Sequence, residues 1–317
     1  MTHVVSTARI SEKHQSRLCR EFPGVRFSFF EGIRDAMKVA SDAGILITYG
    51  EDLDEEKVGG FPELRWIHVI SAGVELLPFA ALKKRGIRVT NARGIHETPM
   101  GEYAVAVILQ WTRKLHQFVD RQRRGVWDRS LRVEELSGKT VSILGTEAIG
   151  RGIAARLKAF GVRVLGMNTD GTPHSLFDET VAPHDLERLM RCSDFVVVTL
   201  PLTPHTRGFI GARELAWMKP TACLINMARG AVVDEGALLK ALSEETIGGA
   251  ILDVFEQEPL PEDHPFWSRQ NVLITPHISG RSPLYMSRAL DLFSHNLRVY
   301  SSGEGEYINL LDLERGY

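Results

Sequence analysis

One alternation in the second half of the sequence narrows the choice of folds more than any other feature. Short runs rich in Val, Ile and Leu recur there, and helical spacing of apolar residues follows each run. The runs occupy residues 140–145, 162–167, 194–200, 222–227, 249–254 and 272–276. Their nearly continuous apolar character is typical of strands that helices cover on both faces. Six such units predict a doubly wound parallel sheet of the Rossmann type.

The first hundred residues repeat this pattern in a weaker form. Candidate strands lie at residues 3–7, 26–30, 44–49, 66–70 and 88–90. Because 317 residues exceed what one compact core usually holds, these strands predict a second α/β domain. An apolar segment at 98–117 predicts one buried helix that joins domains or subunits. A helical segment at 283–300 would return the carboxyl terminus to the first domain.

Composition and charge argue against several classes of protein. The formal net charge of −2 gives no field that would attract nucleic acid or an anionic membrane. The arginine-rich segment 121–132 is interpreted as a solvated arm near a dimer interface. The sequence has no secretory leader, no run of 18 apolar residues and no cysteine cluster, which predicts a cytoplasmic protein. His96 and Glu97 lack the spacing of a metal-binding HExxH helix, so we predict no metal site.

A glycine-rich turn follows the first strand of the Rossmann series. Gly145 and Gly150 occupy the first and third positions of a G-x-G-x-x-G turn, but Glu147 stands in the middle position. The turn still predicts that the pyrophosphate of a dinucleotide binds at the start of the next helix, near Ala148 and Ile149. Since the middle glycine normally lets the backbone approach the pyrophosphate, we expect Glu147 to weaken cofactor binding.

The end of the second strand bears on the choice of cofactor. NAD enzymes place an acid there to hold the adenosine ribose, whereas this chain has Asn168 followed by Thr169. These two side chains could donate hydrogen bonds to a 2′-phosphate. Asp170 is close, however, and no Arg or Lys follows to pair with a phosphate. The pattern allows NADP or NAD, with a slight preference for NADP.

Three polar residues follow the fourth, fifth and sixth strands of the series: Arg229, Glu258 and His277. In an open α/β sheet, ligands bind at the carboxyl ends of the strands. Arg can fix a substrate carboxylate and His can donate a proton near neutral pH. A carboxylate against the imidazole would hold its tautomer and favour its protonated form. Each residue alone could be an ordinary surface group, but together they predict reduction of a 2-oxo acid.

The same segments carry a resemblance to a known family. The most specific are NMARGAVVDEGAL, LDVFEQEPLP and TPHISG, supported by VISAGVE, NARGIHETPMGEYAVA and VTLPLTPHT. Over nearly its whole length the chain resembles the D-isomer-specific 2-hydroxyacid dehydrogenases. The resemblance implies an NAD(P)-dependent oxidoreductase in which Arg229, Glu258 and His277 are catalytic. It also implies a flavodoxin-like substrate domain at residues 1–98 and 282–317, and a Rossmann cofactor domain at residues 99–281.

The resemblance further assigns binding residues. Substrate would be held by Arg229, by His277 and by backbone N–H groups in the VISAGVE loop, at Ser71, Ala72 and Gly73. Asp253 would hold the nicotinamide carboxamide. The dinucleotide groove would also include Leu200, Pro201, Thr206, Met227, Ala228, Ser279 and Gly280.

Functions from different classes remain open at this stage. The first is a reductase of glyoxylate, hydroxypyruvate or a related small 2-oxo acid. The second is a dinucleotide-binding regulatory protein of the same fold with little turnover, which Glu147 favours. Phosphoglycerate dehydrogenase is a narrower third option, although the chain has no residues for the regulatory domain that such enzymes often carry. Members of the family usually form homodimers through the cofactor domain, and we expect the apolar stretch 103–111 to make that contact.

Overall fold

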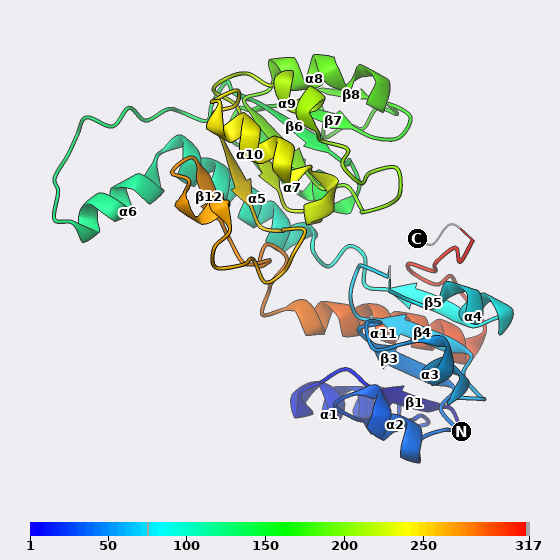
Figure 1. The fold of residues 1–317 in the computed structure, drawn as a ribbon. Coiled ribbons are helices and arrows are strands. Elements are labelled where there is room, and N and C mark those ends of the chain that lie inside the picture. Colours follow the sequence, from blue (N-terminus) through cyan, green and yellow to red (C-terminus); the bar gives the residue numbers. More distant parts are fainter. Residues whose placement is uncertain (75, 315–317) are drawn as a thin grey trace. The chain divides into compact units, whose positions relative to one another are not determined.

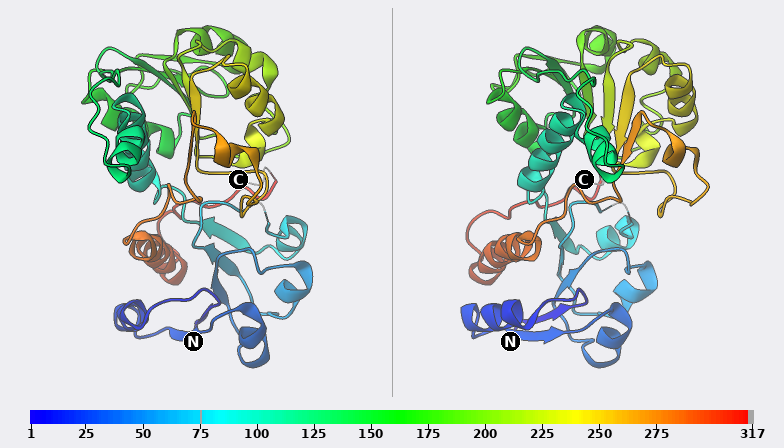
Figure 2. Two further views of the ribbon diagram at one scale, coloured as in Figure 1. Left: turned by 60° about the vertical axis from the view of Figure 1, so that its left-hand side comes forward. Right: turned by 90° about the vertical axis from the view of Figure 1, so that its left-hand side faces the viewer.

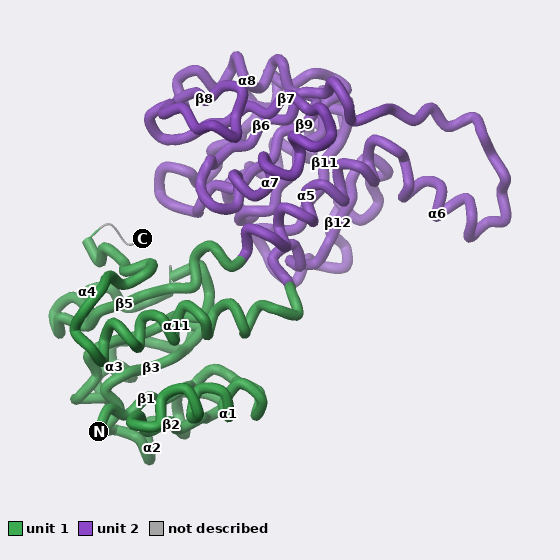
Figure 3. Tube along the Cα trace, turned by 180° about the vertical axis from the view of Figure 1, so that it is seen from behind, with its two compact units in different colours: residues 1–95, 282–317 green, residues 96–281 purple. Residues whose placement is uncertain are grey.

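The computed structural model describes residues 1–74 and 76–314 of the chain. Contacts divide the protein into two compact units, shown in different colours in Figure 3. The first comprises Met1–Ile95 and Ser282–Tyr317, and the second comprises His96–Arg281. Each unit contains its own parallel sheet with apolar cores on both faces.

The first unit is a three-layer α/β structure. Its sheet has five strands among the described residues, in the order β2-β1-β3-β4-β5, and neighbouring strands are parallel. The strands are β1 (His3–Ser6), β2 (Arg26–Phe29), β3 (Ile45–Thr48), β4 (Trp66–Val69) and β5 (Arg88–Asn91). One face is covered by α2 (Ile33–Val39), α3 (Glu55–Gly59) and α4 (Phe79–Lys84), and the other by α1 (Glu12–Glu21) and α11 (Tyr285–Ser302). This strand order is that of flavodoxin-like sheets, so the predicted fold class is confirmed.

The second unit contains a Rossmann sheet. Its order is β12-β11-β10-β9-β6-β7-β8, again with parallel neighbours, and it has seven strands among the described residues. The strands are β6 (Thr140–Leu144), β7 (Arg163–Met167), β8 (Glu179–Val181), β9 (Phe195–Val198), β10 (Cys223–Asn226), β11 (Gly249–Leu252) and β12 (Val272–Ile274). All six predicted strands are present. The seventh, β8, was not predicted because it is a three-residue edge strand with two half-buried positions and no apolar run.

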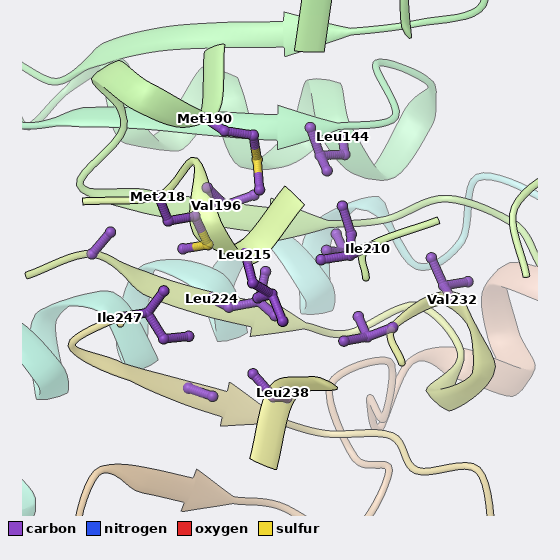
Figure 4. Packing of buried hydrophobic residues seen from close by; sticks show 14 of the residues in the cluster. Leu144, Met190, Val196, Ile210, Leu215, Met218, Leu224, Val232, Leu238 and Ile247 are labelled. Atoms are coloured by element: carbon purple, nitrogen blue, oxygen red, sulfur yellow. The ribbon is translucent and has the colours of Figure 1, made fainter. Parts of the chain in front are cut away.

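Helices cover both faces of the Rossmann sheet, as Figures 1 and 2 show. One face packs against α5 (Glu97–Thr112) and α7 (Ala148–Lys158). The other packs against α8 (Leu186–Cys192), α9 (Ala212–Ala216) and α10 (Glu235–Ser243), with short 3₁₀ helices η1 (Pro183–Asp185), η2 (Gly230–Val232) and η3 (Pro265–Ser268) in the loops. Figure 4 shows this second core, where Leu144, Val196 and Leu224 from the strands pack with Leu215 and Leu238 from the helices. These buried strands hold their carboxyl ends in fixed register along one edge of the sheet.

The segment predicted as one helix over residues 98–117 is two helices. After α5, Lys114 adopts a left-handed conformation with φ 55°, and α6 (Leu115–Arg123) then begins in a new direction. Helix α5 packs so closely on α7 that a Cβ at Gly152 would overlap Glu97. No residue of α6 is buried, and Figure 1 shows α6 and the following segment standing away from the sheet. The buried character that the sequence suggested for the whole segment therefore ends with α5.

Candidate active site

The three predicted catalytic residues lie in the loops after β10, β11 and β12, at the carboxyl edge of the Rossmann sheet. Between β6 and β9 the strand order reverses, and such a switch point is where open α/β sheets bind ligands. The glycine-rich turn leaves the sheet at the same edge, directly after β6. The fold thus collects the predicted catalytic and cofactor residues of this unit along one edge.

The loop that carries Arg229 is fixed by the last residue of β10. The Asn226 side chain donates to the Arg229 carbonyl oxygen at 3.1 Å and accepts from the Ala228 N–H at 3.2 Å. The half-buried Arg229 side chain donates from Nη1 to the Ala228 carbonyl oxygen at 2.9 Å. A Cβ on Gly230 would overlap the backbone of Phe255, so the loops after β10 and β11 are in direct contact. This contact ties the arginine loop to the loop that carries Glu258.

Glu258 and His277 form a hydrogen-bonded pair. The Glu258 Oε2 atom lies 2.7 Å from His277 Nδ1, and Glu258 Oε1 accepts from the Phe255 N–H at 3.0 Å. A carboxylate can only accept, so His277 must carry a proton on Nδ1. The side chains are 35% and 51% exposed respectively, which leaves the opposite ring nitrogen, Nε2, to act on a ligand. This is the arrangement in which a carboxylate orients an acid–base histidine.

Asp253 organises the loop that carries His277. Its fully buried carboxylate accepts from the Thr275 hydroxyl at 2.5 Å and from the N–H groups of Ile278 and Ser279, both at 2.9 Å. The N–H of His277 donates to the Asp253 carbonyl oxygen at 2.8 Å. Because an ionised carboxylate has about four acceptor positions, three are already used within the protein. The nicotinamide contact implied for Asp253 stays a prediction.

His96 lies near the same loop, although the sequence gave it no role. It precedes the first turn of α5, and its Nδ1 lies 3.3 Å from the Gly280 carbonyl oxygen. Burial lowers the pKa of His96, and the charges of Arg229 and His277 lower this pKa further. His96 therefore lies beside the end of the loop that carries His277.

The glycine-rich turn has two positions where the structure requires glycine. Gly145 has φ +108°, and a Cβ there would lie 2.7 Å from the Thr199 hydroxyl oxygen. A Cβ on Gly150 would overlap the Gly145 carbonyl oxygen. Glu147, by contrast, has φ −73°, is exposed, and makes no side-chain capping bond to α7. The helix start, including Ala148, therefore keeps N–H groups that suit a diphosphate, which supports the fit of a dinucleotide.

Asn168 uses its amide within its own loop. It donates from Nδ2 to the Thr146 hydroxyl oxygen at 3.3 Å and to the Thr172 carbonyl oxygen at 2.9 Å, and accepts from the Gly171 N–H at 2.6 Å. Thr169 and Asp170 are exposed beside it. The backbone N–H of Thr172 lowers the pKa of Asp170, whose carboxylate is therefore ionised at neutral pH. Asn168 thus holds the conformation of its own loop, while Thr169 is exposed next to a negative charge.

The remaining predicted groove residues also follow strand ends of the Rossmann sheet. Leu200, Met227, Ala228 and Ser279 are buried, Ile149 and Gly280 are half-buried, and Pro201 is exposed. The Thr206 hydroxyl donates to the Pro201 carbonyl oxygen at 2.6 Å and so closes the loop after β9. Thr206 therefore supports the shape of this loop.

The predicted carboxylate-binding loop lies in the first unit, directly after β4. Its conformation is held through carbonyl oxygens: Asn91 Nδ2 donates to Ala72 at 2.8 Å, and the Ser71 hydroxyl donates to Gly73 at 2.8 Å. The resemblance assigns the backbone N–H groups of Ser71, Ala72 and Gly73 to the substrate, and this role stays a prediction.

Residues 1–74 and 76–314 contain neither a candidate metal site nor a candidate membrane span. No group of three or more His, Cys, Asp or Glu side chains there could hold a metal ion. No helix in those ranges is long and apolar enough to cross a membrane. The site residues that sequence reasoning missed are Asn226, Thr275, His96 and Tyr103, whose hydroxyl lies 2.7 Å from the Thr275 hydroxyl. Their one signal is a polar group that ends or follows an apolar strand, which Asn226 and Thr275 show.

Comparisons with known proteins agree with this geometry. Residues 105–279 match the family described as D-isomer specific 2-hydroxyacid dehydrogenase, NAD binding domain. The chain is 37% identical over 301 residues to a glyoxylate reductase of Thermofilum pendens, covering 92% of this chain and 85% of that protein. A D-isomer specific 2-hydroxyacid dehydrogenase family protein of Aeromonas salmonicida superposes with a TM-score of 0.87 at 33% identity, covering 98% and 99% of the two chains. An NADPH-dependent glyoxylate/hydroxypyruvate reductase of Sinorhizobium meliloti, solved with citrate, gives 0.83 at 29% identity, covering 99% and 98%.

Proposed function

The chain belongs to the D-isomer-specific 2-hydroxyacid dehydrogenase family, and from this premise we propose that it reduces glyoxylate, hydroxypyruvate or a related small 2-oxo acid with NAD(P)H. The observation that carries the proposal is the Glu258–His277 pair at 2.7 Å, on the same sheet edge as Arg229. A 2-oxo acid needs a cation for its carboxylate and a proton donor for its carbonyl oxygen. These side chains supply both.

Each residue has a distinct role in the proposed reaction. The dinucleotide supplies the hydride when it is bound at the glycine-rich turn. Arg229 binds the substrate carboxylate and polarises the ketone. His277 donates the proton on Nε2 to the carbonyl oxygen, while Glu258 holds Nδ1 and stabilises the imidazolium.

A substrate screen tests this function. We expect NADPH or NADH absorbance to fall in the presence of glyoxylate or hydroxypyruvate, with 2-oxo acids of larger side chain as comparison substrates. Binding of the dinucleotide, measured by its fluorescence, should occur in the same preparation. Dinucleotide binding without oxidation by any 2-oxo acid would refute the reductase and favour the regulatory alternative.

The regulatory alternative rested on Glu147 in the glycine-rich turn. The residue has a backbone conformation that any amino acid adopts, and its side chain is exposed to solvent. Glu147 therefore leaves the turn intact, and its carboxylate can point away from a diphosphate. With Glu258 and His277 already paired, the site favours a working reductase.

We propose that NADPH is preferred modestly over NADH. The support is Asn168 at the position where NAD enzymes carry an acid, together with similarity to an NADPH-dependent reductase. The ionised Asp170 opposes a 2′-phosphate and keeps the preference small. We expect kcat/KM for NADPH to exceed that for NADH by about 2- to 10-fold, a difference of roughly 1 kcal/mol. The Asn168→Asp variant should reverse the preference, and an unchanged ratio would contradict the assignment.

We also propose a homodimer formed through the cofactor domain, but with a different contact from the one first expected. The stretch 103–111 is packed largely inside the second unit, where Val107, Ile108 and Trp111 are buried. Exposed apolar side chains lie instead in the segment that starts with α6, and Trp127 is 93% exposed. Such a patch on a protruding segment is typical of a protein interface.

Light scattering after size exclusion tests the dimer. Trp127→Ser should weaken it and shift the mass toward that of a monomer at micromolar concentration. Trp267→Ser, which changes another exposed tryptophan in η3, is the matched control. A wild-type monomer, or equal effects of both changes, would contradict the proposed contact.

We place the protein in the cytoplasm, as the sequence suggested. Cys19, Cys192 and Cys223 are free thiols, which fits a reducing compartment. Cell fractionation with an antibody against the chain tests this placement, and enrichment in any other fraction would contradict it.

A further inference from the structure

Helix α5 contacts both ends of the loop that carries His277. The Tyr103 hydroxyl lies 2.7 Å from the Thr275 hydroxyl, and His96 Nδ1 lies 3.3 Å from the Gly280 carbonyl oxygen. His96 caps the start of α5 and Tyr103 lies seven positions further along, so the first two turns of this helix carry both contacts. The start of α5, with its N-cap residue, therefore contacts both ends of this loop.

The hydrogen bonds at the first end have a fixed direction. The Thr275 hydroxyl donates its single proton to Asp253, so in the pair with Tyr103 the threonine oxygen must accept. Tyr103 is then the donor, and burial raises its pKa so that it keeps this proton at neutral pH. The chain runs from Tyr103 through Thr275 to Asp253, whose carboxylate accepts from the N–H groups of Ile278 and Ser279.

At the other end of the loop the direction is also determined. A carbonyl oxygen only accepts, so His96 carries its proton on Nδ1 when it contacts Gly280. A Cβ on Gly280 would come within 3.0 Å of that ring nitrogen, which shows how closely the imidazole packs on the loop. Between the two ends, the backbone of His277 has φ +52°. Residues other than glycine keep this left-handed conformation when the surrounding structure holds it.

We propose that Tyr103 and His96 are positioning residues of the reductase: through Thr275 and Gly280 they hold the loop so that the His277 imidazole stays aligned on Glu258. Neither residue needs to contact substrate for this role. The inference rests on the proposed function, in which His277 donates the proton.

Tyr103→Phe is the first test, because it removes the hydroxyl and keeps the ring. Loss of one neutral hydrogen bond in a partly buried site should lower kcat by about 3- to 10-fold. The KM for the 2-oxo acid should change by less than about twofold, since Arg229 is untouched. Tyr307→Phe is the matched control: it removes a phenol that accepts from Arg88 Nη1 at 2.6 Å in the first unit, and it should leave kcat unchanged.

A second readout does not depend on activity. The amide protons of Ile278 and Ser279 report the loop directly, because both donate to Asp253. In Tyr103→Phe their hydrogen exchange, followed by NMR, should accelerate by about 3- to 10-fold. The amide of Ile225 in the buried strand β10 should exchange at the wild-type rate.

The Gly280 end of the loop can be tested separately with two substitutions of His96. His96→Asn keeps a side-chain N–H for the Gly280 carbonyl oxygen, whereas His96→Leu removes it. We expect His96→Asn to retain most of kcat, and His96→Leu to lose about as much as Tyr103→Phe.

The outcomes separate the two proposals. Wild-type kcat and wild-type exchange in Tyr103→Phe would overturn the positioning role, while leaving the reductase in place. Equal acceleration at Ile225 would also overturn it, because that pattern indicates general loss of stability. A wild-type protein that reduces no 2-oxo acid would refute the proposed function instead, and the exchange of Ile278 and Ser279 would still decide whether Tyr103 holds the loop.

Discussion

Glu258→Gln is the smallest substitution that we expect to impair His277 as the proton donor. The side chain keeps its size, but one of its two oxygens becomes an NH₂ group. In the wild type both oxygens accept: Oε1 from the Phe255 N–H at 3.0 Å and Oε2 from His277 Nδ1 at 2.7 Å. A Gln amide can satisfy only one of these donors. The variant must either face Phe255 with an NH₂ group or force His277 into the tautomer that lacks the Nδ1 proton.

The size of the effect follows from the pair's environment. A hydrogen bond to a charged group contributes about 1.5–3 kcal/mol. Glu258 and His277 are 35% and 51% exposed, so solvent screening places this pair at the lower end of that range. A loss of about 1.5–2 kcal/mol in the transition state corresponds to a fall in kcat of roughly 10- to 30-fold.

Steady-state oxidation of NADPH with saturating glyoxylate measures this fall. Glu256→Gln is the matched control, because Glu256 is an exposed acid in the same loop. We expect the control to keep the wild-type kcat. If Glu258→Gln stays within twofold of the wild type, or if both variants lose activity equally, the role given to the pair is refuted.

Three further predictions concern the glycine-rich turn, the catalytic candidates and a buried histidine. Glu147→Gly should lower the Kd of NADPH by about threefold in a fluorescence titration, because an exposed carboxylate ~6 Å from a phosphate costs about 0.7 kcal/mol at water-like screening; an unchanged Kd would contradict this. His277→Ala should lower kcat by about 10²- to 10⁴-fold, whereas Arg229→Ala should chiefly raise the KM of the 2-oxo acid, and full activity in either variant removes that residue from the mechanism. Burial lowers the pKa of His68 from 6.5 to about 4, so between these values the unfolded chain binds a proton that the folded chain does not. The free energy of unfolding should therefore fall on acidification from about pH 6.5 toward 4, by up to ~1.4 kcal/mol per pH unit from this residue. Urea unfolding at several pH values measures this free energy. In His68→Gln the free energy of unfolding should depend less steeply on pH than in the wild type.

The sequence predicted the two sheets because buried parallel strands appear as short, nearly continuous apolar runs. The sequence failed to predict two features: a break set by the backbone conformation of one residue, and a short edge strand. The break between α5 and α6 depends on the left-handed backbone at Lys114, and lysine gives no sign of that conformation in a pattern of apolar residues. The edge strand β8 is too short and too exposed to stand out.

The site shows the same division between side-chain identity and backbone contact. Arg229, Glu258 and His277 could be predicted as candidates because their chemistry and their places after strands can be read directly from the sequence. The sequence did not predict that Asp253 holds the His277 loop. Its partners include the backbone N–H groups of Ile278 and Ser279, and every residue except proline has such a group. Tyr103 was assigned to a subunit contact because its neighbours are apolar, although its hydroxyl is directed to Thr275.

The glycine-rich turn shows why one departure from a motif can leave a fold intact. Gly145 is required by its positive φ and by contact with Thr199, and Gly150 by contact with the Gly145 carbonyl oxygen, so both requirements arise inside the protein. The backbone at Glu147 imposes no such requirement. The glycine usual at that position serves the approach of a ligand. Substitution there therefore changes how tightly a dinucleotide binds and leaves folding untouched, which makes the affinity of Glu147→Gly, and not its stability, the quantity that should move.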